Sequence, residues 1–370
     1  MYRSLLHVLL HKGVASLFAL MLFLACTESR APVYRAVVKA GYSGQPGAVI
    51  DGRQNFASIG EALEAVPAAN SSPFAIFVHN GRYSEKLSVD KAHVRLIGES
   101  RDATVITFSA SAATPGPDGE PCGTRGCSTL RVAAPDFRAE NLTIENGFDY
   151  PANLAKSDDD PSKVQNPQAV AVMLTGESDR AVFRNCKIAG YQDTLFPDTG
   201  RSCFDRCRIL GHVDFIFGAG QAVFQECEIV SRNRRDKNPT GTITAPSTPI
   251  RIPYGFLFVD CRLVREDSTL PAASVRLGRP WHPQADPRIS GSAVFIRCYM
   301  DDHIGPIGYA KISSTDSIGQ RIWFDLEPDS RFFEYTSHGP GAVVSPQRPT
   351  LDEKAAAWYT AAHVLDGWIP

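Results

Sequence analysis

Two aspartates stand alone in strongly apolar and aromatic segments. Asp193 lies in Gly190–Phe196, and Asp214 lies 21 positions later in Gly211–Gly218. Burying an ionised carboxylate without a partner is costly, so each residue is either a turn or helix-cap aspartate or a residue retained for chemistry. Because the same interval recurs in a repeat along the chain, we favour chemistry. Two neighbouring carboxylates cannot both ionise freely, which suits one as a proton donor and the other as a nucleophile.

The repeat is a six-residue block with Phe at its first position and Cys at its fourth. Its copies are Phe183–Ile188, Phe204–Ile209, Phe224–Ile229, Phe258–Leu263 and Phe295–Met300, with a weaker one at Asn141–Ile144. The first three begin 21 and 20 residues apart, and inserted loops lengthen the later intervals. Alternation of apolar and charged residues in each block predicts a strand with one buried face. A strand-rich unit of about 20 residues with variable loops is typical of a parallel β-solenoid, an all-β fold.

Several elements outside the repeat are also predicted. Residues Ile59, Ala62, Leu63 and Val66 at helical spacing predict a short amphipathic helix. Ala75–His79 and Val94–Ile97 are expected to be strands joined through Gly81–Glu85. Near the end, Thr350–Glu353 has the pattern of a capping box, which predicts a helix to about Leu365 that packs on the coil or caps it.

A coil of about 20 residues brings polar side chains together on one face. Asp193 and Asp214 are expected on neighbouring rungs, about 4.8 Å apart, facing the same side. Gln168 precedes Gln192 by about one coil, so two amides approach the same point and can stabilise an oxyanion. Within Leu277–Trp281, Arg279 can pair with an aspartate, and Trp281 offers a flat face for a sugar ring. The alternative for Gln168 is a place on the surface. For Arg279 it is an ion pair in the core, and for Trp281 it is simple packing.

The recurring cysteines are expected to form an interior ladder, whose members are Cys186, Cys207, Cys227, Cys261 and Cys298. Adjacent rungs fall within disulfide reach, so a Cys207–Cys227 bridge is predicted, with a second, Cys122–Cys127, closing a small loop. Reduced cysteines acting as small hydrophobic residues are the alternative. A metal site is disfavoured, because the spacings are those of strands and no His joins them.

Four long polar insertions are expected to wall a groove suited to an extended polymer. They are Ser109–Ser128, Asn146–Asn166, Ser231–Tyr254 and Trp281–Ser292. One of them is locally basic, through Arg232, Arg234, Arg235 and Lys237. This suits an acidic polymer, although a solvated charge run is the alternative.

The N-terminus predicts export. Residues 1–25 resemble a signal peptide, with a basic leader and an apolar run too short to span a bilayer, and Cys26 follows in a lipoprotein-like cleavage box. Cleavage as an ordinary signal peptide is the alternative. Residues 26–40 are expected to be a tether and residues 41–370 the folded domain. The expected location is the outer membrane as a lipoprotein, otherwise secreted or periplasmic. With 38 basic and 40 acidic residues, no general attraction to nucleic acid or membrane surfaces is implied.

The segments Gly190–Phe196, Gly211–Gly218 and Leu277–Trp281 closely resemble the signature segments of pectin methylesterases, carbohydrate esterase family 8. Gln165–Val172, Gly81–Glu85 and Asn141–Asn146 are similar to further family segments. The resemblance runs from about Gly41 to the C-terminus and fits the bacterial branch best. It implies a right-handed parallel β-helix with short capping helices and long loops walling a groove.

The resemblance also implies roles. Asp214 would be the nucleophile, Asp193 the general acid and then base, and Arg279 the residue that orients Asp214. Gln168 and Gln192 would form the oxyanion hole. The expected substrate-binding residues are Trp281, Phe217, Phe196, Val213 and Arg234. The implied reaction is hydrolysis of the C6 methyl esters of polygalacturonate by a monomer without metal or organic cofactor. His212 stands where Thr is common in the family, and Phe196 stands where bacterial relatives commonly have Tyr.

Other functions remain to be separated from this one. A serine esterase would need Gly-x-Ser-x-Gly, which the chain lacks. A pectate lyase or polygalacturonase on the same fold would cleave the glycosidic bond, so released methanol separates the two. A relative with a changed acyl-ester or thioester substrate, or a non-catalytic polysaccharide-binding solenoid, is a further alternative.

Overall fold

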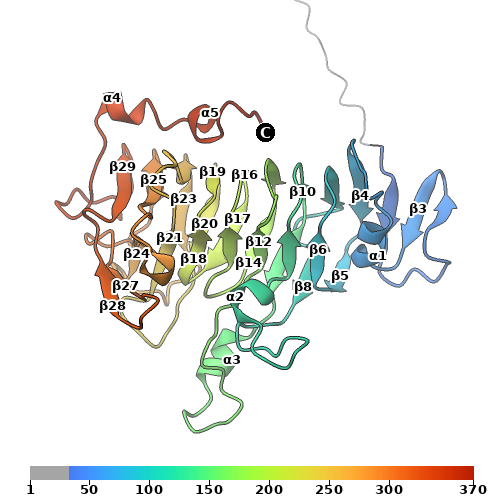
Figure 1. Cartoon of the computed structure of the whole chain (residues 1–370), viewed down its shortest axis with the longest axis horizontal. Helices are drawn as coiled ribbons and strands as arrows, with labels where there is room; N and C mark the ends of the chain where they lie inside the picture. The colour runs from blue at the N-terminus through green and yellow to red at the C-terminus, as the bar shows by residue number, and fades with distance from the viewer. Residues whose placement is uncertain (1–32) are drawn as a thin grey trace, which may run out of the picture. The chain divides into compact units, whose positions relative to one another are not determined.

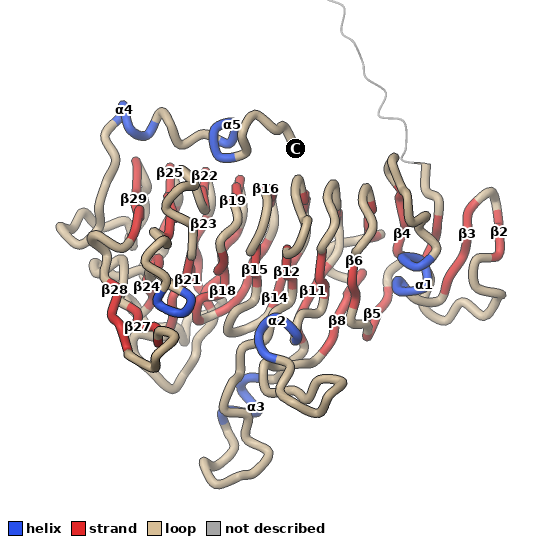
Figure 2. Tube along the Cα trace, in the orientation of Figure 1, coloured by secondary structure: helices blue, strands red, loops and turns tan. Residues whose placement is uncertain are grey.

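Strands stack in three long sheets that follow one another around each coil, forming a parallel β-helix (Figure 1; Figure 2). This computed structural model describes residues 33–370. The predicted signal peptide and Cys26 lie outside the described residues. The successive coils stand side by side from the N-terminal to the C-terminal end of the described chain (Figure 1).

Three sheets carry the coils. Sheet A has the order β2 (Ala48–Ile50), β3 (Arg53–Phe56), β1 (Ala36–Val38), β4 (Phe74–Val78), β7 (Val94–Gly98), β10 (Arg138–Glu140), β13 (Ala181–Arg184), β16 (Arg201–Asp205), β19 (Gln221–Gln225), β22 (Phe256–Val259), β25 (Gly291–Ile296) and β29 (Ser330–Tyr335). Sheet B has the order β5 (Gly81–Ser84), β8 (Thr104–Phe108), β11 (Thr143–Asn146), β14 (Lys187–Ala189), β17 (Arg208–Gly211), β20 (Glu228–Ser231), β23 (Arg262–Arg265) and β26 (Tyr299–Met300). Sheet C has the order β6 (Leu87–Val89), β9 (Leu130–Val132), β12 (Val172–Leu174), β15 (Leu195–Pro197), β18 (Val213–Gly218), β21 (Gly241–Pro246) and β24 (Val275–Gly278). An antiparallel hairpin of β27 (Ile312–Thr315) and β28 (Arg321–Phe324) stands apart from these sheets.

Each Phe–Cys block is a corner of the coil, and the prediction that it is a single strand is wrong. In the first full copy, β13 ends at Arg184, β14 begins at Lys187, and Asn185 between them has φ 48°. The equivalent residues of the later copies, Arg206, Glu226, Asp260 and Arg297, also have φ near 50°. This left-handed residue turns the chain from sheet A to sheet B while the Phe, the Cys and the following Ile, Leu or Met still point inward. The apolar alternation therefore continues across the corner and mimics one strand.

The inward side chains of equivalent blocks stack on one another. Phe183 and Phe204 lie with ring centroids 4.9 Å apart, and Phe204 and Phe224 lie 4.8 Å apart, with nearly parallel rings. Phe258 and Phe295 continue the stack at 4.4 Å and 4.6 Å. These rings are fully buried, so the repeat read from the sequence is the core of the solenoid.

We expect Phe204→Ala to lower the free energy of unfolding by about 3–5 kcal/mol, because it removes a fully buried ring from the middle of the stack. Chemical denaturation of the two proteins measures the difference. Trp323→Ala, which removes a ring that is 61% exposed, is the control and should change stability by less than about 0.5 kcal/mol. Equal losses in the two variants would contradict the assignment of the core.

The cysteine ladder is present, but the two predicted disulfides are absent, because the described cysteines are free thiols. Stacked equivalent residues keep their Cβ atoms about one strand spacing apart, whereas a disulfide needs about 3.5–4.5 Å. Each thiol instead contacts a carbonyl of the preceding coil: Cys207 Sγ lies 3.3 Å from Phe183 O, and Cys227 Sγ lies 3.2 Å from Phe204 O. Cys122 and Cys127 likewise donate to separate carbonyls, those of Ser111 and Thr124.

At the N-terminal end, the predicted helix is confirmed as α1 (Ile59–Glu64), capped by Ser58 with Glu61 in a capping box. The strands predicted at 75–79 and 94–97 are confirmed as β4 and β7. The tether predicted over 26–40 is wrong at its end: β1 pairs with β3 and β4, and Ala36 and Val38 are buried. Residues 81–84, expected as a connection, form β5, because the coil needs a strand in sheet B there.

The C-terminal segment packs along sheet A, as one of the two expected placements. The single helix predicted up to Leu365 is instead two short ones, α4 (Glu353–Ala356) and α5 (Ala361–Val364). Asp352, not Thr350, is the first N-cap, and Thr360 caps the second helix. The break between them lets Val364 and Leu365 reach an apolar cluster on sheet A, where Gln221 Nε2 donates to Val364 O at 2.7 Å.

Two of the four insertions carry α-helices, α2 and α3, and leave the coils between sheets B and C. These helices stand out below the strands (Figure 1). The first contains α2 (Gly123–Gly126), the second α3 (Tyr150–Leu154), and the fourth the 3-10 helix η1 (Pro283–Ala285). The third is not a plain loop, because β21 lies within it and adds a rung to sheet C. Among residues 33–370, no helix has the length and apolar character needed to cross a bilayer.

Candidate active site

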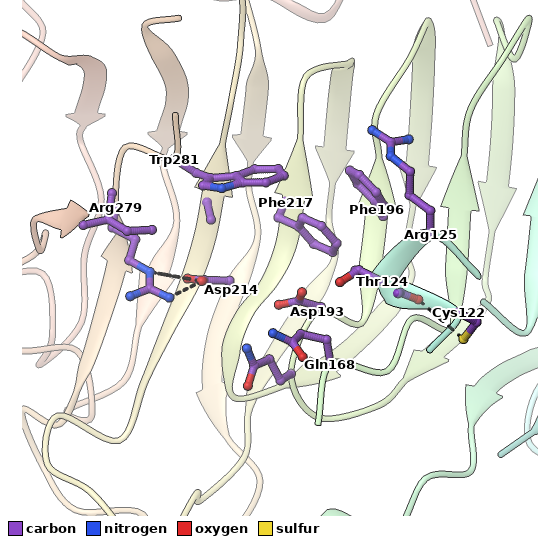
Figure 3. Close-up of a pocket in the computed structure, with 14 residues that line it drawn as sticks. Cys122, Thr124, Arg125, Gln168, Asp193, Phe196, Asp214, Phe217, Arg279 and Trp281 are labelled. Atoms are coloured by element: carbon purple, nitrogen blue, oxygen red, sulfur yellow. Dashed lines mark hydrogen bonds and ion pairs between the residues drawn. The ribbon is translucent and has the colours of Figure 1, made fainter. Parts of the chain in front are cut away.

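A cavity of about 610 Å³ opens on the outer face of sheet C (Figure 3). It is lined by Cys122, Gly123, Thr124, Arg125, Gln168, Gln192, Asp193, Phe196, Asp214, Phe217, Ala245, Arg279, Trp281 and Ile312. The two aspartates, the two glutamines, the arginine and the tryptophan predicted from spacing are all in this set. The structure therefore brings the predicted constellation into one cavity.

The two aspartates occupy equivalent places on neighbouring coils. Leu195 of β15 pairs with Ile216 of β18, and Asp193 N donates to Val213 O at 3.1 Å. Both aspartates are in the left-handed region, with φ 62° for Asp193 and φ 48° for Asp214. This backbone conformation is costly for a residue with a side chain, and it turns both carboxylates out of the sheet toward the cavity.

An irregularity in β18 produces this outward turn at Asp214. The pairing of β18 with β21 shifts register between Val213 and Ile216. Phe215 and Ile216 both face the core, so the strict alternation is broken where the aspartate leaves the sheet. Gly211 permits the tight path, because a Cβ there would lie 2.2 Å from Phe215 Cβ.

Arg279 fixes one of the two carboxylates. Its Nε donates to Asp214 Oδ1 at 2.8 Å and to Oδ2 at 3.0 Å, and its Nη2 also donates to Oδ2 (dashed lines, Figure 3). Burial lowers the pKa of Arg279, but the charge and hydrogen bonds of Asp214, together with Asp193, raise it overall. A guanidinium that donates to both carboxylate oxygens fixes the Asp214 side chain in one orientation.

Asp193 is in a different electrostatic environment. Removal from water raises its pKa well above the usual range, the Asp214 carboxylate raises it further, and Arg279 opposes the shift. The pair thus contains one carboxylate fixed by an arginine and one carboxyl that favours its proton. This separation is the arrangement that a nucleophile and a general acid require.

The two glutamines come from successive coils and meet at the same edge of the cavity. Ala169 N donates to Gln192 O at 3.1 Å, which places the residues after Gln168 beside Gln192. The side-chain oxygen of Gln168 is buried with no hydrogen-bond partner among the described residues. A buried polar atom without a partner is uncommon, and a role in the site is one explanation for this one, because Gln168 lines the cavity.

Three aromatic rings form a row above the aspartates, here called the aromatic row: Phe196, Phe217 and Trp281 (Figure 3). The Phe196 and Phe217 rings stack with centroids 4.1 Å apart, and Trp281 lies 5.8 Å from Phe217. Trp281 is partly exposed, so its face is open to the cavity. Phe196 and Phe217 are almost fully buried, so the exposed aromatic surface beside the carboxylates belongs to Trp281.

Two predicted substrate-binding residues lie outside the cavity. Val213 is buried, and Arg234 forms an ion pair with Asp236 at 3.0 Å and donates from Nε to Tyr150 Oη at 3.2 Å. The arginines of the basic insertion therefore contact other residues of the protein. Arg232, for example, pairs with Glu266 and lies 4.1 Å from the centroid of the Tyr191 ring. It fastens the segment that carries Gln192.

His212, at the position where the family commonly has Thr, belongs to this neighbouring cluster. It is buried, and its ring packs edge-on against Tyr150 with centroids 4.4 Å apart. Burial, together with Arg234 and Arg232, lowers the pKa of His212 to about 3. His212 is thus a neutral packing residue that supports the wall formed by α3.

Several cavity residues were not predicted. Thr124 and Arg125 come from α2, and Ile312 comes from the hairpin strand β27. The length of the 109–128 insertion indicated a wall but gave no means to choose one side chain within it. Within residues 33–370, no cluster of three or more His, Cys, Asp or Glu side chains could hold a metal ion.

The fold and the site together define a class, the parallel β-helix proteins with two neighbouring aspartates, one of them fixed by an arginine, beneath an aromatic row. A family model described as pectinesterase matches residues 48–367. The chain is 44% identical to pectinesterase A of Dickeya dadantii (strain 3937) over 373 residues, covering 97% of this chain and 99% of that relative. The chain belongs to the pectinesterase family, which places it among the carboxylic ester hydrolases.

Solved structures agree with this assignment. A pectin methylesterase in complex with hexasaccharide VII is 45% identical, with a TM-score of 0.86 over 92% of this chain and 99% of that one. Pectin methylesterase from Yersinia enterocolitica is 48% identical, with a TM-score of 0.81 over 85% of this chain and 99% of that one. The expected family and the expected parallel β-helix are both confirmed.

Proposed function

We propose that this protein hydrolyses the C6 methyl esters of polygalacturonate to free carboxylates and methanol through an aspartyl acyl-enzyme. The observation that carries the proposal is the pair of aspartates in one cavity, with Arg279 on Asp214 and a raised pKa on Asp193. Family membership and the partly exposed ring of Trp281 support the choice of a uronic acid polymer.

The first half-reaction forms the covalent intermediate. An Asp214 carboxylate oxygen attacks the ester carbonyl, and the electron pair of the C=O bond moves to its oxygen. The Gln168 and Gln192 amides face this developing oxyanion from the cavity edge. As the tetrahedral intermediate collapses, protonated Asp193 gives its proton to the departing methoxide, and methanol leaves.

The second half-reaction restores the enzyme. Asp193, now a carboxylate, takes a proton from water, and the hydroxide attacks the acyl carbon of the substrate in the mixed anhydride. The bond to Asp214 breaks, which returns Asp214 as a carboxylate held by Arg279 and releases the galacturonate acid group. The proton that Asp193 gave to methanol is thereby replaced from water.

Methanol release from highly methyl-esterified pectin tests the proposal. The expected result is one methanol for each carboxylate formed, with no new reducing ends and no unsaturated products. Reducing or unsaturated ends without methanol would establish cleavage of the glycosidic bond instead. Hydrolysis of an acyl thioester in preference to pectin would establish a changed substrate, and binding of pectin without turnover would establish a polysaccharide-binding protein.

We also propose that the chain is exported and anchored through a lipid on Cys26, because residues 1–26 have the pattern of a lipoprotein signal. Labelled palmitate should be incorporated into the protein in cells and lost in Cys26→Ser, which should move from the membrane to the soluble fraction. Equal labelling of both proteins would contradict the anchor.

A further inference from the structure

Arg232 directly follows β20, at the start of the basic insertion, and its side chain contacts the segment that leads into Gln192. It does not line the cavity, whereas Gln192 does. We propose that Arg232 is a positioning residue for the reaction: it holds the two residues before Gln192, so that the Gln192 amide faces the developing oxyanion. The inference rests on the proposed function, because it concerns how one donor of that oxyanion hole is kept in place.

The Arg232 guanidinium makes three kinds of contact at once. Its Nη1 donates to Gly190 O at 2.9 Å, and its Cζ lies 4.1 Å from the centroid of the Tyr191 ring. Its Nε donates to both carboxylate oxygens of Glu266, at 3.1 Å and 3.0 Å, and its Nη2 donates to Oε1 at 2.9 Å. The Arg232 side chain is only 20% exposed, and hydrogen bonds from a charged donor are the stronger kind. The guanidinium therefore ties Glu266 to both the backbone of Gly190 and the ring of Tyr191.

The segment around Gln192 is held from both ends. Asp193, directly after it, has φ 62°, a conformation that persists only where the surrounding structure imposes it. On that side, the backbone is held by the pairing of β15 with β18. On the other side, Arg232 binds Gly190 O and the Tyr191 ring. Loss of Arg232 therefore frees the segment on the side of Gln192 and leaves the side of Asp193 in place.

The coil keeps its own backbone hydrogen bonds without this guanidinium. Gly190 N donates to Leu210 O at 3.2 Å, and His212 N donates to Tyr191 O at 3.0 Å. The expected consequence of removing the guanidinium is therefore a displaced Gln192 amide in a folded protein. A displacement of about 1 Å in a group that acts on the transition state can slow a reaction by about 100-fold.

Arg265 is a matched arginine on the next coil, because the pairing of β20 with β23 places it beside the residue before Arg232. Its side chain is 25% exposed and forms ion pairs with Asp301 and Asp302. Its Nη1 donates to Leu270 O at 3.3 Å. None of these partners lines the cavity, so Arg265 has ion-pair and carbonyl contacts of the same kind without a path to the oxyanion hole.

The kcat and KM of variants on methyl-esterified pectin provide the test. Arg232→Ala should lower kcat by about 10- to 100-fold with little change in KM, because an oxyanion donor acts in the transition state. Arg265→Ala should keep the wild-type kcat. Arg232→Lys keeps a charge but lacks the planar fork, so it should restore part of the kcat that Arg232→Ala loses. Thermal unfolding shows which variants are folded at the assay temperature. If Arg232→Ala is not, Arg232→Lys carries the test, with a kcat below that of the wild type at the same KM.

A double-mutant cycle shows whether Arg232 acts through Gln192. Gln192→Ala removes the donor and should lower kcat by about 10²–10³-fold. In that background, Arg232→Ala should lower kcat by no more than about twofold, because the group that Arg232 positions is gone. Independent contributions would instead multiply.

An unchanged kcat in the folded Arg232 variants, an equal loss in Arg265→Ala, or a loss confined to KM would overturn the inference. So would a full additional loss in the Gln192→Ala background, since Arg232 would then act by another route. If the wild-type protein released no methanol from pectin, the proposed function itself would fail. Methanol release by the wild type with a kcat independent of Arg232 would leave the esterase intact and refute this inference alone.

Discussion

Asp214→Asn should reduce kcat on methyl-esterified pectin by about 10⁴-fold or more, the size of effect seen when a covalent nucleophile is removed. The amide keeps the shape of the carboxylate and an oxygen for Arg279, but it is a poor nucleophile. Because the substrate contacts of the aromatic row remain, KM should change little. Continuous detection of methanol measures the rate, and mass spectrometry of quenched wild-type enzyme should find the acyl group on Asp214.

The comparison needs a carboxylate in a similar setting away from the cavity. Asp205 ends β16 in sheet A and is also held by an arginine, with Arg184 Nε at 2.9 Å. Asp205→Asn should therefore keep wild-type activity. Activity of Asp214→Asn within tenfold of wild type would rule out Asp214 as the nucleophile, and acyl transfer to another residue would reassign the role.

The fold was predictable because the side chains that stack in the core recur in the sequence once per coil. A parallel coil places equivalent residues on top of one another, so Phe183, Phe204 and Phe224 must each suit the same interior position. The same stacking explains why each Phe–Cys block was wrongly predicted to be one strand, when it is a corner between two strands. Inward-facing residues continue across the left-handed residue Asn185, and a pattern of burial cannot reveal that the chain turns there.

The site was predictable to the extent that it follows the period of the coil. Asp193 and Asp214 lie one coil apart and Gln168 and Gln192 about one coil apart, so their meeting follows from the repeat. Arg125 is supplied by an insertion, whose path depends on tertiary packing and not on the period. The preferred Cys207–Cys227 bridge was wrong for a geometric reason, and the alternative of reduced cysteines holds: being one rung apart satisfies the Cα distance of a disulfide but not the Cβ distance.

Asp193→Asn should lower kcat by about 10²–10⁴-fold, the contribution of a positioned general acid, and raise stability at neutral pH. Burial and the Asp214 carboxylate raise the pKa of Asp193 in the folded state, so the folded protein binds more protons than the unfolded chain. Stability therefore falls as pH rises from the ordinary carboxyl pKa of about 3.9 toward the raised one. An amide has no such proton to lose, and the variant should keep the stability that the wild type loses over this range.

Thermal unfolding as a function of pH measures this difference, and a second aspartate supplies a control of opposite sign. Arg180 donates to both oxygens of Asp136, at 2.7 Å and 2.6 Å, and lowers the pKa of that carboxyl. The stabilisation by Asp136 is present above about pH 3.9 and is lost as pH falls through its lowered pKa, so Asp136→Asn should destabilise the protein at neutral pH. Wild-type activity should also decline as rising pH deprotonates Asp193. If Asp193→Asn loses activity but is no more stable than wild type at neutral pH, a raised pKa of Asp193 does not explain its role as the general acid.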